Sequence, residues 1–194
     1  MRTAPNGSDG ASLAEMAIVL AIISSVVGIG FPVLSNSVDA KRTRDAASFL
    51  ASQFRLARQR AVMTGRNVAI VFDDGSGEVG WRLCEDGNRD GVSREDIDSG
   101  LDRCQEPAQP LAYRFSQVAV GYLPGVPSPD GEFDGAPLRF GLARMAVFTP
   151  GGTATAGTVA VRGPSANQFA VRVSGVTGRT RVLRFDPGSR EWIE

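Results

Sequence analysis

Residues 10–34 read GASLAEMAIVLAIISSVVGIGFPVL, a single apolar segment that follows a short polar leader. About 20 apolar residues in a helix cross the hydrocarbon core of a bilayer, so this segment is long enough to span a membrane. Its one charged residue, Glu15, lies close to its start. Because a bare carboxylate inside hydrocarbon costs several kcal/mol, Glu15 is expected to have a partner, and a newly freed N-terminal amine is the obvious one.

Two plainer interpretations of this segment stand beside that one. An ordinary signal peptide is cleaved after its apolar run, whereas the Gly10–Ala11 junction precedes the run. A plain single-span anchor leaves both Glu15 and that junction unexplained. Neither alternative therefore accounts for the whole pattern.

The segment resembles the N-terminus of type IV pilins and type II secretion pseudopilins. In that family a prepilin peptidase cleaves after a Gly, the new N-terminal amine is methylated, and a Glu at the fifth mature position guides docking into a filament. Here Gly10 stands at the cleavage position, Ala11 becomes the first mature residue, Glu15 the fifth, and Pro32 takes the place of the usual helix-kinking proline. The chain departs from the family pattern at three positions, Asp9, Ala11 and Ala14.

The basic residues on either side of the segment bear on its orientation in the membrane. Arg2 is the only basic residue before the span, while Lys41, Arg42 and Arg44 follow it. The positive-inside rule would place the C-terminal part in the cytoplasm. The resemblance implies the opposite, a single-pass protein of the bacterial inner membrane with its C-terminal domain in the periplasm or outside. We follow the resemblance.

Composition leaves about 150 residues after the leader and span, which is one globular domain of ordinary size. The net charge is zero, but residues 73–134 carry fourteen acids and five arginines, and residues 135–185 carry seven arginines and no acid. With no His and two Cys, a conventional zinc site is not expected. No nucleophile–base pair, phosphate loop or dinucleotide fingerprint is present, so the sequence does not read as an enzyme.

The two cysteines, Cys84 and Cys104, bracket an acidic, Gly-rich loop. In an exported domain we expect them to form a disulfide, with a gain of roughly 3 kcal/mol in stability. The alternative is two free thiols in a cytoplasmic domain.

The periodicity of the chain predicts an α+β fold. Apolar residues recur at three- and four-residue steps between Ala46 and Ala61, which predicts one long helix over residues 13–64, kinked near Pro32 and ending at Gly65. Short strands are expected beyond it, and an antiparallel sheet would pack on the apolar helix face. The expected strands are residues 67–72, 79–83, 111–115, 118–122, 138–140, 146–148, 158–161, 169–173 and 181–185, with a loop over 123–137.

The resulting division is a leader over residues 1–10, a transmembrane and filament-core helix over 11–34, an amphipathic half-helix over 35–65 and a β-rich globular domain over 66–194.

The C-terminal half of the chain narrows the resemblance to one family. Residues 148–159 (FTPGGTATAGTV) look like the Phe-x-Pro-x-Gly turn of the GspH/FimT minor pilin family, and residues 171–181 (VRVSGVTGRTR) look like its closing hairpin. This implies the pilin fold and a minor subunit near a filament tip.

Gly178-Arg179-Thr180-Arg181 matches a GRxR motif that is implicated in DNA binding in FimT-type pilins. Side chains at alternate strand positions share a face, so Arg179 and Arg181 would project together, extended by Arg172 or Arg184. Guanidinium groups pair bidentately with phosphate oxygens and would give salt-sensitive, sequence-independent binding. The alternative is that these arginines are ordinary surface residues or pair with acids of a neighbouring subunit.

Asp86, Asn88 and Asp90 match the first half of a calcium-loop pattern, with oxygen ligands at alternate positions and Gly91 following them. The twelfth position is Ile97 in place of the bidentate Glu. The pattern therefore predicts a calcium site at Asp86, Asn88 and Asp90, against the alternative of a solvated turn.

Together these features predict a minor pilin or pseudopilin that primes or caps a type IV pilus or a type II secretion pseudopilus. The expected partners are other pilins or pseudopilins, prepilin peptidase, the inner-membrane assembly platform and the membrane. The second function is a tip subunit that captures DNA for uptake through Arg179 and Arg181. A membrane-tethered calcium-binding domain is a third.

Overall fold

The computed structural model describes residues 12–75, 78–105, 107–131 and 135–194, with side chains left out at 26–36 and 74–75. The chain falls into two compact units, Met1–Val38 and Asp39–Glu194, which are described separately below. Helix α1 (Leu13–Thr64) contributes to both. Gly65 follows α1 with φ +64° and donates its N–H to the carbonyl of Ala61, so glycine ends the helix as predicted.

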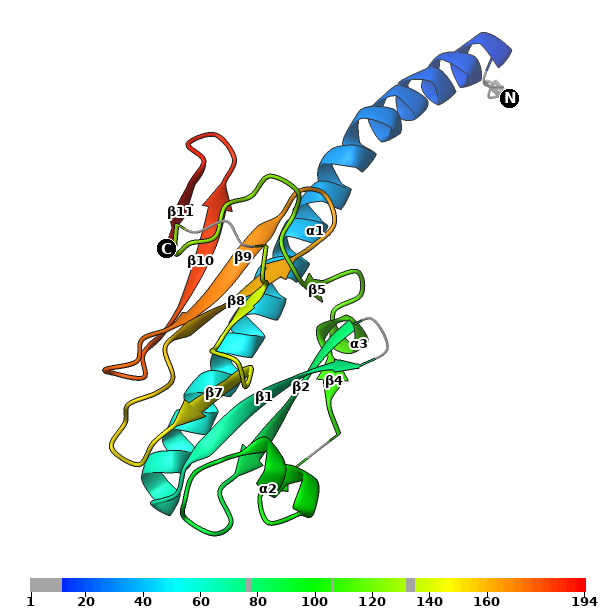
Figure 1. Cartoon of the computed structure of the whole chain (residues 1–194). Coiled ribbons are helices and arrows are strands. Elements are labelled where there is room, and N and C mark those ends of the chain that lie inside the picture. The colour runs from blue at the N-terminus through cyan, green and yellow to red at the C-terminus, as the bar shows by residue number, and fades with distance from the viewer. Residues whose placement is uncertain (1–11, 76–77, 106, 132–134) are drawn as a thin grey trace, which may run out of the picture. The chain divides into compact units, whose positions relative to one another are not determined.

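In the described part of the second unit, the strands form two antiparallel sheets (Figure 1). The first has the order β3-β2-β1-β7, with β4 also paired to β2, and the second has the order β11-β10-β9-β8-β5, with β6 also paired to β8. The strands of the first sheet are β1 (Val68–Gly75), β2 (Glu78–Glu85), β3 (Arg103–Cys104), β4 (Gln109–Pro110) and β7 (Met145–Phe148). Those of the second are β5 (Ala119–Val120), β6 (Leu138–Arg139), β8 (Gly157–Arg162), β9 (Gln168–Val173), β10 (Thr180–Asp186) and β11 (Glu191–Ile193).

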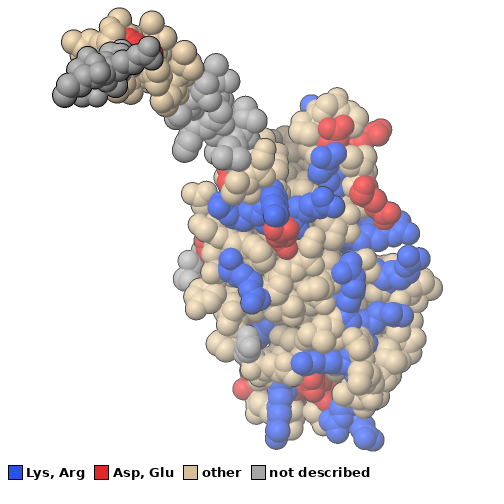
Figure 2. Space-filling model, turned by 180° about the vertical axis from the view of Figure 1, so that it is seen from behind, with Lys and Arg blue, Asp and Glu red and all other residues tan. Residues whose placement is uncertain are grey.

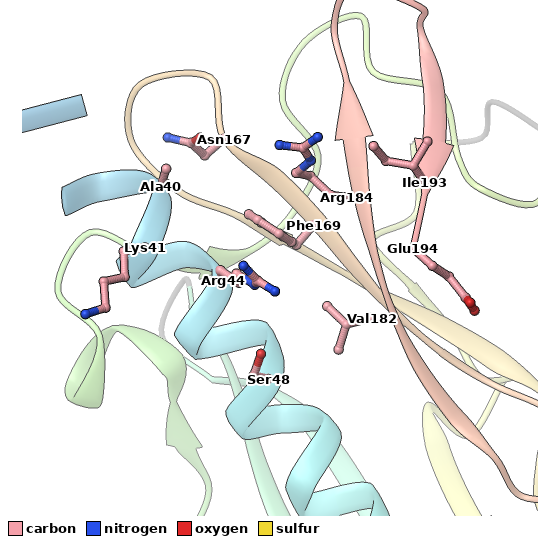
Figure 3. A pocket seen from close by; sticks show the side chains of 10 residues that line it. All are labelled: Ala40, Lys41, Arg44, Ser48, Asn167, Phe169, Val182, Arg184, Ile193 and Glu194. Atoms are coloured by element: carbon pink, nitrogen blue, oxygen red, sulfur yellow. The ribbon is translucent and has the colours of Figure 1, made fainter. Parts of the chain in front are cut away.

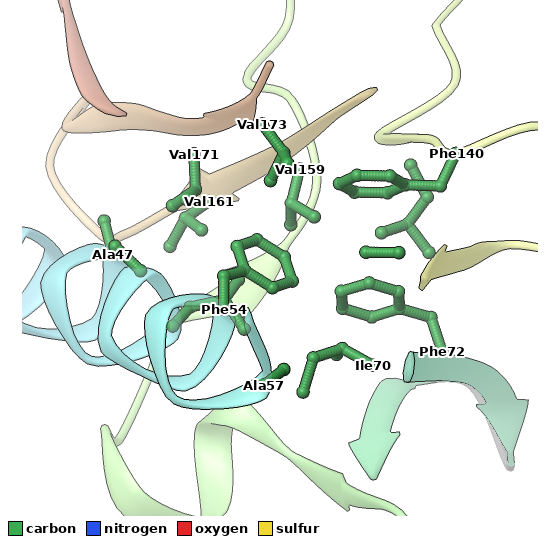
Figure 4. Packing of buried hydrophobic residues seen from close by; sticks show 14 of the residues in the cluster. Ala47, Phe54, Ala57, Ile70, Phe72, Phe140, Val159, Val161, Val171 and Val173 are labelled. Carbon is green, nitrogen blue, oxygen red and sulfur yellow. The ribbon is translucent and has the colours of Figure 1, made fainter. Parts of the chain in front are cut away.

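The core lies between α1 and both sheets. The predicted apolar face of the helix is fully buried, and Ala51 joins it. The predicted residues are Ala46, Ala47, Leu50, Phe54, Ala57 and Ala61. The many alanines let the helix backbone approach the sheets closely. Phe54 fills the space that they leave, and the centroid of its ring lies 5.8–6.2 Å from those of Phe72, Phe140 and Phe148. Figure 4 shows Phe54 with Phe72 and Phe140. The Phe54 side chain of α1 thus contacts two residues of the first sheet and Phe140, which follows β6 of the second sheet.

The α+β prediction is confirmed, and two local predictions need correction. Residues 111–115, predicted as a strand, form helix α3 (Leu111–Arg114). Pro110 presets the backbone at its start with φ −69°, and the N–H of Phe115 donates to the carbonyl of Leu111. A proline before a short apolar run therefore outweighs the strand propensity of that run.

Helix α2 (Arg94–Ser99) was not predicted, although its sequence carries both end signals. Ser93 caps it by accepting the N–H of Asp96, and Gly100 ends it in the left-handed region at φ +80°. Both signals lie in the acidic loop for which the sequence pattern predicts a calcium site. Asp96 lies in the first turn, where a carboxylate complements the helix dipole.

Candidate functional site

The predicted processing and assembly residues belong to the first unit. Gly10 and Ala11 lie outside the described residues, and Pro32 lies where α1 is described without side chains, so cleavage and the kink stay predictions. Glu15 lies in the first turn of α1 and is exposed. Around it the described helix exposes apolar side chains on all sides, from Leu13 (90% exposed) to Ile23 (52%).

Among the residues whose side chains are described, no helix offers an apolar stretch long enough to cross a membrane.

The cysteine loop is held to the first sheet by covalent and polar contacts. Cys84 of β2 and Cys104 of β3 stand opposite each other in the strand register and form a disulfide. Asp102, buried inside the loop, accepts the N–H groups of Gly87 and Ser93 at 2.9 and 3.0 Å. The loop is thus organised by its own backbone donors.

The three residues of the predicted calcium site do not converge as ligands. Asp86 is buried, and its carboxylate accepts from the N–H of Arg89, the N–H of Gly91 and the amide of Asn67. Asn88 donates to Asp90 at the exposed tip. Within the described chain, no group of three or more His, Cys, Asp or Glu could hold a metal ion. The calcium prediction therefore finds no support in this loop, where Asp86 has the role of a turn-stabilising carboxylate.

The predicted arginines of the C-terminal hairpin divide between two faces of the second sheet. Arg172 of β9 and Arg181 of β10 are directly opposite each other in the register. They line, together with Arg179, one shallow pocket of about 470 Å³. Arg184 lies three positions after Arg181 on β10, so its side chain points to the opposite face of the sheet, the one that carries α1. There it lines a different pocket with Lys41 and Arg44 (Figure 3). Of the two residues expected to extend the patch, Arg172 lines this pocket and Arg184 does not, because alternate strand positions face opposite ways.

Two carboxylates moderate the like-charge pair of Arg172 and Arg181, which by itself would be destabilising. Arg172 hydrogen-bonds Asp130, which comes from the loop before β6, and Arg181 pairs with Glu194 at 2.8 Å. Both acids lie far from the motif in sequence, so no sequence signal identified them. Arg179 forms no ion pair in the described part of the chain.

The hairpin between β9 and β10 rests on α1. Arg58 of α1 donates its Nε to the carbonyl of Gly152, in the turn after β7, at 3.3 Å. A Cβ on Gly178, which has φ +60°, would lie 2.9 Å from Arg58. Seen from the side on which α1 lies, the surface carries more basic than acidic side chains (Figure 2). Gly178 is thus needed for the turn and for close packing on Arg58, and Arg179, which follows it, lies beside the helix.

Asp186 is the last residue of β10 and accepts hydrogen bonds from the turn that follows it. A hydrogen bond from the Ser189 hydroxyl, followed by the N–H groups of Gly188 and Ser189, lowers the pKa of Asp186, and the charge of Arg184 adds to this. These contacts hold the turn that leads into β11.

A long helix packed through an alanine-rich face on antiparallel sheets, with an apolar N-terminal continuation, defines a pilin-like structural subunit. The family described as type II transport protein GspH matches residues 46–178, well over half of the chain, and the chain belongs to this family. Members of the family are minor pseudopilins, structural subunits that assemble with other pseudopilins in the secretion pseudopilus at the inner membrane, and not enzymes.

Among solved structures, the chain is similar to the minor pseudopilin EpsH from the type 2 secretion system of Vibrio cholerae. The identity is 12%, the match covers 74% of this chain and 97% of that one, and the TM-score is 0.46. No curated protein matches the chain significantly.

Proposed function

We propose that this chain is a minor pseudopilin that a prepilin peptidase cleaves between Gly10 and Ala11, with methylation of Ala11. In this proposal residues 1–10 are the leader, 11–34 the membrane and filament-core helix, 35–65 the amphipathic half-helix and 66–194 the globular domain. The observation that carries the proposal is the apolar surface of α1 between Leu13 and Ile23, exposed on all sides. A contiguous apolar surface of this kind needs a membrane or a partner to cover it.

The function of Glu15 follows from its isolation in this surface. In the assembly step, Glu15 neutralises the Ala11 amine of a neighbouring subunit. The attraction between the two charges is strong in a low-dielectric setting, and an unpaired charge there is penalised. The carboxylate thus selects the axial position at which a subunit docks. The inner-membrane assembly platform is the partner that would drive this step.

Processing is tested by mass spectrometry of the protein recovered from cells with an active prepilin peptidase. The expected N-terminus is methylated Ala11, and replacement of Gly10 by Leu should leave the leader attached. A mature protein that still begins at Met1 would rule out the proposal, whereas the Glu15→Ala variant should be cleaved normally and serves as the control.

A second candidate function is DNA capture, which the grouping of Arg172, Arg179 and Arg181 around one pocket favours. Guanidinium groups on neighbouring strands can follow a phosphate backbone without reading its sequence. Asp130 and Glu194 already engage two of the three, so Arg179 would be the principal contact. The charge available for binding is therefore smaller than the motif alone suggests.

Gel-shift measurements at two salt concentrations test this second function. Changing Arg179 and Arg181 to Gln should weaken binding equally for unrelated DNA sequences and flatten the salt dependence by about one unit of slope per lost contact. Arg103→Gln, which removes an exposed cation from β3 of the first sheet, is the matched control. No binding at low salt would leave the structural function alone.

A further inference from the structure

The last turns of α1 carry a stripe of basic and apolar side chains on one side of the helix. These residues follow the spacing i, i+3, i+4, i+7 and i+8 and are Arg55, Arg58, Gln59, Val62 and Met63. Together with residues 178–180 of the β9–β10 hairpin they line a shallow pocket of about 600 Å³. Val62 and Met63 are 53% and 76% exposed, so the described chain leaves this surface, the helix stripe, uncovered.

The lining of the helix stripe holds three arginines and no acid. Arg55 and Arg58 of α1 lie beside Arg179 of the hairpin, and none of the three takes part in an ion pair in the described part of the chain. A phosphate backbone would satisfy these arginines but would leave Val62 and Met63 without a partner. Arginine and methionine together are enriched in protein interfaces. The helix stripe therefore fits a protein surface that offers acids beside an apolar side chain.

Helix α2 of the same chain carries a surface of this complementary kind. Glu95 and Asp98 are three positions apart and share a face of the helix, and both are exposed and outside every ion pair of the described residues. Leu101 is 54% exposed, and it lies beside α2 because the N–H of Asp102 donates to the carbonyl of Asp96. Glu95, Asp98 and Leu101 form the α2 surface.

The helix stripe and the α2 surface lie on opposite sides of the first sheet. Ile70 and Phe72 of β1 belong to the core that packs on α1, whereas Ala69 and Val71 belong to a second cluster, against which Ile97 of α2 packs. Because alternate strand residues face opposite ways, α1 covers one face of the sheet and the loop with α2 covers the other. The sheet separates the two surfaces within one molecule, and a second copy can bring them together.

We propose that the helix stripe of one molecule binds the α2 surface of a second copy. In this contact Met63 packs on Leu101, and with the two helices running in the same direction Arg55 lies opposite Glu95. The contact is heterologous, since each molecule uses one surface as acceptor and the other as donor, and such contacts repeat into rings or open filaments. It uses residues of the globular domain alone and goes beyond the pairing of Glu15 with a neighbouring amine.

Cysteine cross-linking of the purified full chain in a non-ionic detergent tests the proposal. Two differently tagged chains are mixed and oxidised, one with Met63→Cys and the other with Leu101→Cys, and this pair should form a mixed disulfide. Met63→Cys mixed with Tyr113→Cys, at a position that is 82% exposed and outside both surfaces, should give little product. A chain with both Met63→Cys and Leu101→Cys should give a ladder of multimers, because a head-to-tail contact repeats.

An exchange of charges distinguishes docking from random collision. Arg55→Glu on the chain with Met63→Cys, or Glu95→Arg on the chain with Leu101→Cys, should lower the cross-link yield roughly fivefold or more, because like charges then face each other. The two changes combined should restore the yield. Arg190→Glu, which reverses an exposed cation in the turn before β11, is the matched control and should leave the yield unchanged.

Three outcomes would overturn the proposal. Equal yields for Met63→Cys mixed with itself and with Leu101→Cys would show collision or symmetric pairing. A combined charge exchange that does not restore the cross-link would contradict the assigned pairing. A loss of DNA affinity in Arg55→Glu with an unchanged cross-link would assign the helix stripe to nucleic acid. None of these readouts requires cleavage at Gly10 or docking through Glu15, so a failure of the proposed function is recognised separately.

Discussion

Phe54 is the residue on which the core of the domain depends. Its ring contacts Phe72 of β1, Phe148 of β7 and Phe140 beside β6, and it is fully buried. Phe72 and Phe140 also stack on each other at 5.9 Å. Since one side chain joins helix α1 to residues of both sheets, its loss opens a cavity that no single neighbour can fill.

Phe54→Ala should therefore lower the free energy of unfolding by about 3–5 kcal/mol, the range for large-to-small changes of aromatic residues in cores. Chemical denaturation monitored by circular dichroism measures it. Tyr113→Ala, which removes an aromatic side chain that is 82% exposed, should change stability little. Equal effects of the two variants would contradict the central position of Phe54.

Asp186 makes a second residue-level prediction, because hydrogen bonds from Ser189 and Gly188 lower its pKa. A carboxyl group with a depressed pKa contributes stability above its unfolded pKa, and this contribution is lost as the pH falls through its folded pKa. Ser189→Ala should raise the pKa of Asp186 toward its usual range and shift this loss to higher pH. An NMR titration of the Asp186 carboxyl carbon detects the change, and Ser99→Ala serves as the control.

The packing of α1 against the end of β8 depends on a glycine. Thr43 is completely buried on the helix, and its hydroxyl donates to the carbonyl of Asp39. A Cβ on Gly163 would lie 1.8 Å from that hydroxyl oxygen, so helix and strand end touch only because Gly163 has no side chain. The close approach fixes where the helix crosses the second sheet.

Gly163→Ala should consequently destabilise the domain by about 1–3 kcal/mol through overpacking. Thermal unfolding of this variant is compared with that of Gly188→Ala, where the new Cβ would meet its nearest neighbour at 3.7 Å. A stable Gly163→Ala variant would mean that α1 can shift away from β8 at no cost.

The disulfide between Cys84 and Cys104 closes the loop that contains helix α2. It closes a loop with a sequence separation of 20 residues, and such a cross-link stabilises by about 3 kcal/mol, mainly by restricting the unfolded chain. Replacement of both Cys84 and Cys104 by Ser should remove this amount. Denaturation of the oxidised, reduced and substituted proteins measures it, and a reduced protein as stable as the oxidised one would contradict the expectation.

The whole molecule combines a self-sufficient domain with an apolar helix that has no covering within the described chain. The domain buries its helix face under two sheets, whereas side chains such as Met16 and Leu20 stay 56% and 63% exposed. In the proposed function, a membrane or a filament covers this apolar surface.

Glu15→Ala addresses this division directly. The variant should remain in the membrane fraction, because removal of a charge eases insertion. It should nevertheless fail to enter the pseudopilus, since the amine of its neighbour would lack a partner. Fractionation and co-isolation with other pseudopilins measure the two steps. Glu15→Asp, which keeps the charge, is the comparison, and normal assembly of the Ala variant would show that the carboxylate is incidental.

The sequence by itself determined the fold class, because the signals for a helix, its buried face and its end are periodic or local in the sequence. The spacing of Ala46 to Ala61 specified the buried face of α1, and Gly65 specified its end. The α+β class followed from one helix succeeded by short β-branched runs. Local competition explains the errors: a proline converted residues 111–115 from strand to helix, and Ser93 and Gly100 formed caps within a loop interpreted as a calcium site.

Only the tertiary structure decided which charged groups meet. Asp130 reaches Arg172, and Glu194 reaches Arg181, across sequence separations that carry no pattern. The placement of α1 beside β10 likewise brings Arg44 and Arg184 to one pocket. Strand register and helix placement set these pairings, and both depend on the packing of the whole domain. A single surface charge contributes little to stability, so it leaves no local sequence signal of its partner.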